Sequence, residues 1–382
     1  MAKSHPKVLD IFSGCGGMSW GLEKNGFQTI GAIDNWQIAL DTFKHNHPDA
    51  LTINGDISQM DPSTVMAELG LEEGELDCLV GGPPCQGFSK NVRAASRFLD
   101  DPRNQLFRDY VRFVKAFMPK VIVMENVAEI YNAYEGTVRT EIIELLEGLG
   151  YEVEVKVLFA PEYGVPQRRR RCFFFASRTG HKPVMPEPQF AKEDSETVFG
   201  TLPKYRSAWS AISDLPILQN GEGTDGMNYM AEPENEFQAQ MRKDSSLLFN
   251  HISNKLRDTQ FARVSSLKAG EDIRHLPPEL RPKSGYSGAY GRLDYEGVAP
   301  TITRWVFHIG SGRYSHPREN RALTMREAAR LQSFSDDFVF LGSRNDQAGQ
   351  IGNAVPPLLM AAFADNIKAC LSHQQQTLSL VA

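Results

Sequence analysis

The 382-residue sequence predicts an α/β fold, in which a mostly parallel sheet carries helices on both faces, together with a second, smaller and irregular domain. Up to about residue 180, short β-rich runs alternate with segments of helical spacing. Beyond residue 183 this alternation stops, and prolines at positions 183, 186, 188 and 203 with the glycine-rich stretch 220–228 indicate loops. We therefore expect one domain at residues 1–184, completed by 345–382, and a second at residues 185–344.

The elements of the first domain follow from the same patterns, in chain order. Strands are expected at residues 7–12, 29–34, 51–53, 76–81, 120–125, 151–159 and 171–177, and helices at residues 18–25, 36–46, 63–69, 104–117 and 138–149. No helix separates the last two strands, so these should pair antiparallel. Residues 324–334 and 353–371 regain helical spacing, the latter with proline near its start.

Composition excludes several classes of protein. No apolar run is long enough to span a bilayer and neither end resembles a signal peptide, so a cytoplasmic protein is expected, without a membrane partner. The cysteines lack metal-ligand spacing, which predicts neither a zinc site nor a disulfide framework. The net charge of -6 argues against a uniformly basic nucleic-acid binder, but residues 164–182 contain six basic residues and no acid.

Polar residues follow the first three strands, where parallel sheets bind ligands. "DIFSGCGG" (10–17) ends a strand in a glycine turn that lets a ligand approach a helix N-terminus, although a plain tight turn is the alternative. Asp34 is placed to hold ribose hydroxyls and Asp56 to accept an exocyclic amine. Ser19 stands where a dinucleotide fingerprint has its third glycine, so a nucleoside-bearing cofactor other than NAD or FAD is expected.

"GGPPCQGFS" (81–89) places Cys85 on a rigid mount after the fourth strand. Such a thiol can be a nucleophile in its thiolate form, although a lone cysteine is more often a small buried residue. "MENV" (124–127) places Glu125 at the end of the neighbouring strand, so a carboxyl group and a thiol should face one pocket; a helix-capping acid is the alternative.

"VPQRRRRCFFF" (165–175) adds a cluster of cations. Alternation along a strand would put Arg169 and Arg171 on one face and Arg168 and Arg170 on the other. One of these pairs could instead form a solvated basic edge that prevents further strand pairing.

Taken together, these motifs resemble those of the DNA (cytosine-5) methyltransferase family, of the bacterial restriction-modification type. The matching segments occur in the family's order: "DIFSGCGGMSWGL", "GAIDNW", "NGDIS", "GGPPCQGFS", "DPRNQLF", "MENV", "QRRRR", "RALTMREAARLQSF" and "QIGNAVPP". The resemblance implies an S-adenosylmethionine-dependent, Rossmann-like methyltransferase domain and a small target-recognition domain. It also implies double-stranded DNA as the partner of a monomer, and functional pairing with a restriction endonuclease.

The resemblance also assigns residues. Expected contacts of S-adenosylmethionine are Phe12, Gly14, Gly16, Gly17, Asp34, Asn35, Asp56, Ile57, Leu106, Asn353 and Val355. Asn35 departs from the larger residue common at that position, and Trp36 beside it could compensate.

The implied reaction uses a cysteine nucleophile. Cys85 would add to C6 of a cytosine turned out of the helix, Glu125 would protonate N3, and Arg171, more than Arg169, would hold O2. Residues 89–104 resemble a loop that closes over DNA.

DNA recognition is expected in the irregular domain. Six arginines between residues 301 and 330 would suit phosphates and guanines. The rival interpretations are an RNA methyltransferase of the same fold, whose "CFT" segment is absent, a Rossmann oxidoreductase, and a non-catalytic DNA-binding homologue.

Overall fold

The structure is a computed structural model that describes residues 5–84, 106–197 and 200–381, and it separates into two compact units. Unit 1 comprises Met1–Phe159, Arg170–Glu187 and Leu359–Ala382, and unit 2 comprises Ala160–Arg169 and Pro188–Leu358. The expected boundary at residue 184 lies three residues before that of unit 1. Residues 160–169 and 345–358, however, belong to unit 2, because their side chains and backbone bond within it.

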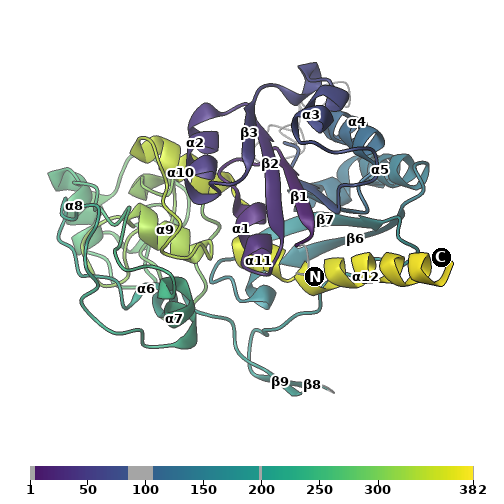
Figure 1. Cartoon of the computed structure of the whole chain (residues 1–382). Coiled ribbons are helices and arrows are strands. Elements are labelled where there is room, and N and C mark those ends of the chain that lie inside the picture. Colours follow the sequence, from purple (N-terminus) through teal and green to yellow (C-terminus); the bar gives the residue numbers. More distant parts are fainter. Residues whose placement is uncertain (1–4, 85–105, 198–199, 382) are drawn as a thin grey trace. The chain divides into compact units, whose positions relative to one another are not determined.

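Unit 1 is built on a seven-stranded sheet with the order β3-β2-β1-β4-β5-β7-β6. Figure 1 labels β1, β2, β3, β6 and β7 of this sheet. Its strands are β1 (Lys7–Ile11), β2 (Gln28–Asp34), β3 (Leu51–Asn54), β4 (Cys78–Gly81), β5 (Val121–Val127), β6 (Glu152–Phe159) and β7 (Arg170–Ser177). The first five strands are parallel, whereas β7 runs antiparallel to both β5 and β6. The α/β fold class and the antiparallel pairing of the last two strands are therefore confirmed.

Helices join the parallel strands at the expected places. They are α1 (Gly17–Glu23), α2 (Gln37–Asn46), α3 (Pro62–Glu68), α4 (Leu106–Phe117) and α5 (Thr137–Glu147). Short 3-10 turns lie at η1 (Ile57–Gln59), η4 (Ala128–Tyr131) and η5 (Ala133–Gly136). The connections from β1 to β4 are long enough for the parallel crossovers that this sheet requires.

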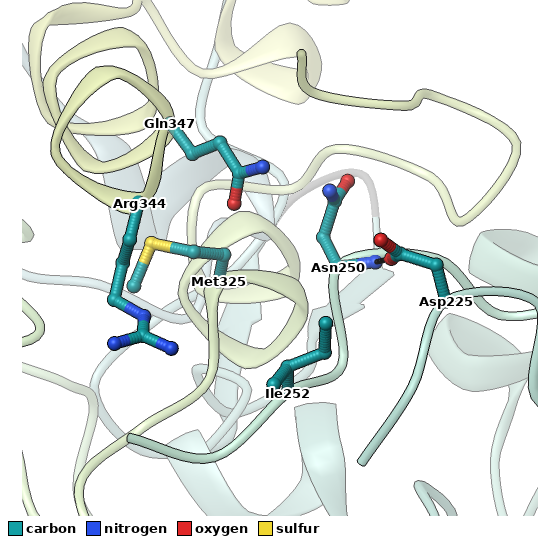
Figure 2. Close-up of a pocket in the computed structure, with 6 residues that line it drawn as sticks. All are labelled: Asp225, Asn250, Ile252, Met325, Arg344 and Gln347. Atoms are coloured by element: carbon teal, nitrogen blue, oxygen red, sulfur yellow. Dashed lines mark hydrogen bonds between the residues drawn. The ribbon is translucent and has the colours of Figure 1, made fainter. Parts of the chain in front are cut away.

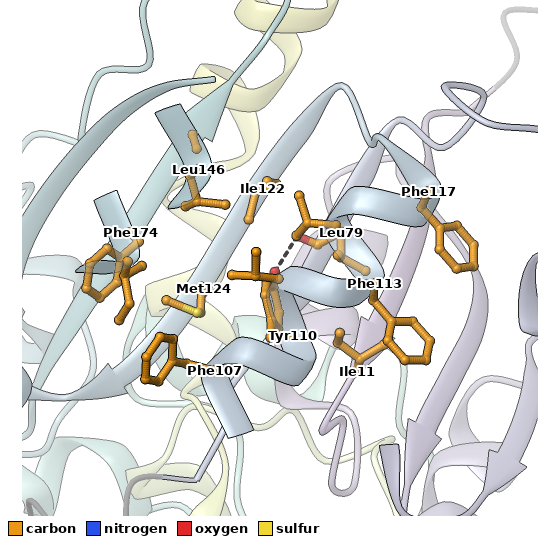
Figure 3. Packing of buried hydrophobic residues seen from close by; sticks show 14 of the residues in the cluster. Ile11, Leu79, Phe107, Tyr110, Phe113, Phe117, Ile122, Met124, Leu146 and Phe174 are labelled. Carbon is orange, nitrogen blue, oxygen red and sulfur yellow. Dashed lines mark hydrogen bonds between the residues drawn. The ribbon is translucent and has the colours of Figure 1, made fainter. Parts of the chain in front are cut away.

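The main hydrophobic core lies between the sheet and helices α4 and α5 (Figure 3). Phe113 and Phe117 of α4 are fully buried, and their rings stack with centroids 6.1 Å apart. Tyr110, from the same helix, donates its hydroxyl to the Leu79 carbonyl at 3.1 Å, which satisfies its one polar atom in the core. The apolar spacing of α4 therefore fixes this helix against the middle of the sheet.

The opposite face of the sheet has its own apolar contacts. Side chains alternate along β7, so Phe174 joins the main core while Phe173 and Phe175 point the other way. Both rings contact Phe363, at centroid distances of 4.9 and 5.6 Å. The return of the chain after residue 359 thus covers the second face.

Unit 2 has few and short regular elements, as the prolines and glycines predicted. They are η6 (Ala160–Tyr163), β8 (Ser195–Thr197), β9 (Gly200–Leu202), α6 (Ala208–Ile212), α7 (Glu236–Arg242), α8 (Asp258–Ser265), η7 (Ile273–His275), η8 (Pro278–Leu280), η9 (Ile309–Ser311), α9 (Met325–Leu331) and α10 (Arg344–Asn353). Strands β8 and β9 pair antiparallel.

The single helix expected at residues 353–371 is wrong. The structure has α10 ending at Asn353, then α11 (Pro357–Ala361) and α12 (Ala364–Val381). Ala354 is extended and two prolines follow it, so no helix continues through this stretch. The polar sequence of α10 gave no apolar period, and its start is set by a capping box between Ser343 and Asp346.

In the described part of the chain no single helix is long and apolar enough to cross a membrane, although one bent pair, 344–361 with 364–372, has suitable length and composition.

Candidate active site

The carboxyl ends of the five parallel strands lie at one edge of the sheet, and this edge gathers most of the predicted site residues of unit 1. The register pairs Ile11 with Ile33 and with Gly81, and Gly81 with Met124. The residues that end or follow these strands are Phe12, Asp34, Asp56 and Glu125. The structure therefore brings the glycine turn, both aspartates and the glutamate to a common edge.

The turn after β1 has an unusual backbone. Phe12, Gly14 and Gly16 have φ angles of 59°, 52° and 97°, all in the left-handed region. Gly16 is the N-cap of α1, and Gly17 is the first residue of that helix. The left-handed conformation costs glycine little, but for Phe12 it is unfavourable and persists only where neighbouring groups hold it.

Asp34 is one of the groups that hold this turn. Its Oδ2 accepts the Gly14 N–H at 2.8 Å, and its Oδ1 accepts the Trp36 N–H at 2.9 Å. Burial raises the pKa of Asp34, and these N–H groups partly offset that rise. Asn35, which lies between Asp34 and Trp36 in the sequence, is exposed, whereas Trp36 is half-buried.

Asp56 and Ile57 lie after β3. Asp56 caps η1 by accepting the Ser58 N–H at 3.0 Å, and Ile57 is buried. Arg112 of α4 donates to the carbonyls of Ile57 and Met60. The helix that begins at Leu106 thereby fixes the segment after β3.

Glu125 and Arg171 form an ion pair at the end of β5. Arg171 Nε lies 2.7 Å from Glu125 Oε1, and the two side chains are only 18% and 12% exposed. They come from neighbouring antiparallel strands, where Arg171 pairs with Val127. The sequence predicted both residues for one site, and the structure brings their charged groups into contact.

Cys85 and the predicted loop 89–104 lie outside the described residues, but the segment leading to Cys85 is described. Asn126, which is buried, donates its Nδ2 to the Pro83 carbonyl at 3.0 Å, and its Oδ1 accepts the Val127 N–H at 2.8 Å. A Cβ on Gly82 would lie 3.0 Å from Glu125 Oε2. The chain therefore passes close to Glu125 just before Cys85.

Arg169 lies in a different setting from Arg171. It precedes β7 by one residue, so strand alternation does not pair the two arginines. Its side chain is 1% exposed and donates to the carbonyls of Ile302 and Gly352, at 3.2 and 3.0 Å, within unit 2. Asn353, at the end of α10, and buried Val355 also belong to unit 2.

The arginines of residues 301–330 correct a prediction. Arg321, Arg326 and Arg330 are fully buried, so they are not available for phosphates or guanines. Arg330 bonds to Asp214 and Asp336, and Arg321 bonds to Glu327. The sequence shows the charge of a side chain but not the carboxylate that it meets after folding.

Asp10 is a buried carboxyl group that the sequence interpretation did not use. It is 1% exposed, and its Oδ2 accepts the Ser19 hydroxyl at 2.7 Å. Burial raises its pKa to about 7. An aspartate in the middle of the apolar strand "KVLDI" was the available signal.

A small hollow in unit 2, of about 130 Å³, is lined by six residues, Asp225, Asn250, Ile252, Met325, Arg344 and Gln347 (Figure 2). The Asn250 N–H donates to Asp225 Oδ1 at 2.7 Å. None of the predicted site residues lines it, and small-molecule sites are usually larger, roughly 300–1,000 Å³. Among the residues the structure describes, no group of three or more His, Cys, Asp or Glu side chains is placed to hold a metal ion.

Known proteins are similar to this chain over most of its length. Type II methyltransferase M1.HphI of Haemophilus parahaemolyticus is 36% identical over 362 residues, covering 94% of this chain and 86% of that protein. Type II methyltransferase M.DdeI of Desulfomicrobium norvegicum is 35% identical over 381 residues, covering 94% and 88%.

Solved structures with the same fold include a DNA modification methyltransferase encoded within a prophage (E. coli), with a TM-score of 0.75, 24% identity and coverage of 96% of this chain and 99% of that one. The methyltransferase EhMeth of Entamoeba histolytica gives a TM-score of 0.62 at 16% identity, covering 97% and 99%. The family model described as C-5 cytosine-specific DNA methylase matches residues 6–369. The chain therefore belongs to this family and is a DNA (cytosine-5-)-methyltransferase.

Proposed function

We propose that this enzyme transfers a methyl group from S-adenosylmethionine to C5 of a cytosine flipped out of a specific double-stranded DNA sequence, through a covalent bond between Cys85 and C6. The observation that carries the proposal is the Glu125–Arg171 ion pair beside the backbone that leads to Cys85. An acid and a cation held 2.7 Å apart suit the N3 and O2 atoms on one edge of cytosine.

The carboxyl ends of the parallel strands fit the proposed methyl donor. A Cβ on Gly14 would meet no heavy atom within 4 Å, so there is open space beside the turn. The Asp34 carboxylate accepts backbone N–H groups, and its two oxygens have about four lone-pair sites, so it can also accept a bond from a ribose hydroxyl. Bound there, S-adenosylmethionine would supply an electrophilic methyl group.

The other predicted donor contacts are proposed with it. As the family resemblance implies, these are Phe12, Gly16, Gly17, Asn35, Asp56, Ile57, Leu106, Asn353 and Val355. An aromatic face such as that of Phe12 favours a neighbouring cation, which here would be the sulfonium.

The proposed chemistry begins at Cys85. Its thiolate forms a bond to C6, and Glu125 gives a proton to N3 as charge develops on the ring. The C5 atom then takes the methyl group and loses its proton to a base. The C6–S bond breaks and N3 returns its proton to Glu125, which restores the thiolate and the acid and leaves 5-methylcytosine.

The two predicted arginines have different proposed roles. Arg171 holds O2 of the cytosine and orients Glu125. Arg169 does not contact the cytosine in this proposal, because its guanidinium donates to the carbonyls of Ile302 and Gly352. It stabilises the backbone of unit 2 at these two residues.

Unit 2 is proposed to recognise the DNA sequence. Trp305 is 53% exposed, and the Arg304 guanidinium lies 5.3 Å from its ring centroid. Tyr286 is 56% exposed, and its hydroxyl donates to the Ser311 carbonyl, which joins its loop to that of Trp305. Residues 281–291 and 299–318 contain no carboxylate, so this surface suits DNA in a chain of net charge -6.

The biological setting is proposed from the relatives. Both M1.HphI and M.DdeI are named Type II methyltransferases. We infer that this enzyme protects cytoplasmic DNA from a partner restriction endonuclease, and that it works as a monomer.

The decisive experiment traps the covalent bond. A target duplex with 5-fluorocytosine can accept the methyl group but cannot lose fluorine as a cation, so the enzyme should remain attached to it. A denaturing gel should show a shifted band that needs S-adenosylmethionine and is absent with Cys85→Ser. Methylation without such a band would contradict the covalent step, and methylation of tRNA instead of DNA would contradict the substrate.

The acid role has its own test. Glu125→Gln should reduce turnover roughly 10²–10⁴-fold, with little change in DNA affinity. The matched control is Glu141→Gln, which alters another ion-paired carboxylate of unit 1, 2.7 Å from Arg108. Wild-type turnover in Glu125→Gln would refute the role.

A further inference from the structure

The glycine turn of the proposed donor site is in contact with a histidine that none of the motifs includes. A Cβ on Gly16 would lie 2.7 Å from His47 Nε2, and 2.8 and 2.9 Å from two ring carbons of Phe43. The Gly16 backbone therefore lies directly against the imidazole ring. His47 is the C-cap of α2, far from the turn in sequence.

The imidazole ring is held on several sides. His47 Nδ1 lies 2.8 Å from Glu23 Oε2, and the histidine side chain is fully buried. Its ring lies 4.3 Å from that of Phe43, at 32°, and meets Trp20 edge-on at 5.5 Å. Glu23 ends α1, so the pair connects the end of that helix with the end of α2.

This support matters because the shape of the turn is not fixed by its own sequence. Gly14 and Gly16 adopt many backbone conformations at little cost, and Phe12 has a left-handed φ angle that is unfavourable for a residue with a side chain, so surrounding groups must select this conformation. Asp34 holds the turn through the Gly14 N–H at 2.8 Å. His47 meets it at Gly16, where the glycine has no side chain to stand between the backbone and the ring.

We propose that His47, oriented by Glu23, is a positioning residue. Its ring fixes the position of the Gly16 backbone in the glycine turn and thereby determines the affinity for the methyl donor. The inference rests on the proposed binding of S-adenosylmethionine at this turn. If His47 only filled the core, replacing it would lower stability and would affect the binding of the donor and of DNA equally. If His47 positions the turn, replacing it should weaken the binding of the donor but not that of DNA.

The test uses calorimetric titration of the full-length protein with S-adenosylhomocysteine, the stable compound that the donor becomes when it loses its methyl group. His47→Ala should weaken its binding at least about tenfold, while the affinity for duplex DNA changes less than about twofold. Glu23→Gln should bind almost as the wild type, because its amide oxygen still accepts the bond, and Glu23→Ala should fall between. His45→Ala, an exposed histidine on the same helix, is the control.

Other results would contradict the positioning role of His47. Unchanged S-adenosylhomocysteine affinity in His47→Ala with a lower Tm would show a purely structural role, as would equal losses for S-adenosylhomocysteine and DNA. If His47→Ala does not fold, His47→Phe, which keeps the ring but loses the bond to Glu23, should still weaken S-adenosylhomocysteine binding, and wild-type affinity there would refute the inference. A wild-type protein that binds no S-adenosylhomocysteine would refute the proposed donor site itself.

Discussion

The two units of this enzyme bury different kinds of large side chain. The largest fully buried side chains of unit 1 are aromatic: Phe43, Tyr110, Phe113, Phe117, Phe173, Phe174 and Phe175. Those of unit 2 are Phe334 and four arginines, Arg169, Arg321, Arg326 and Arg330. The first unit is therefore held together mainly by apolar packing, and the second also by buried cations.

The difference follows from the backbone. Long strands and helices satisfy their own N–H and C=O groups, so apolar side chains can fill the space between them. Irregular loops leave carbonyls that need donors, and arginine carries five N–H groups in a fixed arrangement. Arg326 shows this directly, because it donates to the carbonyls of Phe249, Ser335 and Phe338.

The largest expected effect on stability is in unit 2. Arg330→Met removes a buried cation and leaves Asp214 and Asp336 without it, which should cost about 3–5 kcal/mol. Hydrogen exchange with mass spectrometry should show lost protection in α9 while peptides of β4 and β5 stay protected. Arg318→Met, whose side chain is 47% exposed, is the control, with an expected change within about 0.5 kcal/mol. Equal losses of stability in Arg330→Met and Arg318→Met would contradict the conclusion that buried cations stabilise unit 2.

A smaller effect is expected from the buried carboxyl group of unit 1. The folded pKa of Asp10 is raised to about 7 from an ordinary value of 3.8, so the folded state binds the proton more tightly. The protonated carboxyl group therefore stabilises the folded state fully below about pH 4. This stabilisation is lost as the pH rises from about 4 through about 7, and the free energy of unfolding falls by at most about 4 kcal/mol.

Asp10→Asn should remove this loss, because the amide oxygen still accepts the Ser19 hydroxyl but does not ionise. Urea unfolding should therefore show the variant gaining stability over the wild type between pH 5 and pH 8. Asp41→Asn, an exposed carboxylate on α2, should leave the profile unchanged. A parallel pH profile for Asp10→Asn and the wild type would exclude this role for Asp10.

The smallest effect should come from trimming the apolar core. Ile122→Val removes one methylene from a fully buried site in β5 and should cost about 0.5–1.5 kcal/mol, with little dependence on salt. Ile217→Val, at a residue that is 62% exposed, should cost almost nothing. Equal losses for Ile122→Val and Ile217→Val in urea unfolding would contradict the role of apolar packing in unit 1.

Much of the candidate site could be predicted from the sequence, because its residues lie at strand ends. Apolar alternation located the strands, and the parallel pairing that it implies places Asp34 and Glu125 at one edge of the sheet. The same logic failed where the sequence has no period, because polar α10 was missed. Residues 160–169 fall in unit 2, although they precede the expected domain boundary in the chain.

The sequence by itself determined the α/β class, the order of the motifs and the residue types at the strand ends, since these depend on local spacing that each segment carries. Only the tertiary structure decided which charges meet. It paired Glu125 with Arg171, buried Arg321, Arg326 and Arg330 away from solvent, and placed His47 against Gly16. The physical reason is that the partner of a charged or packed side chain is set by long-range contacts, which the neighbouring residues in sequence do not encode.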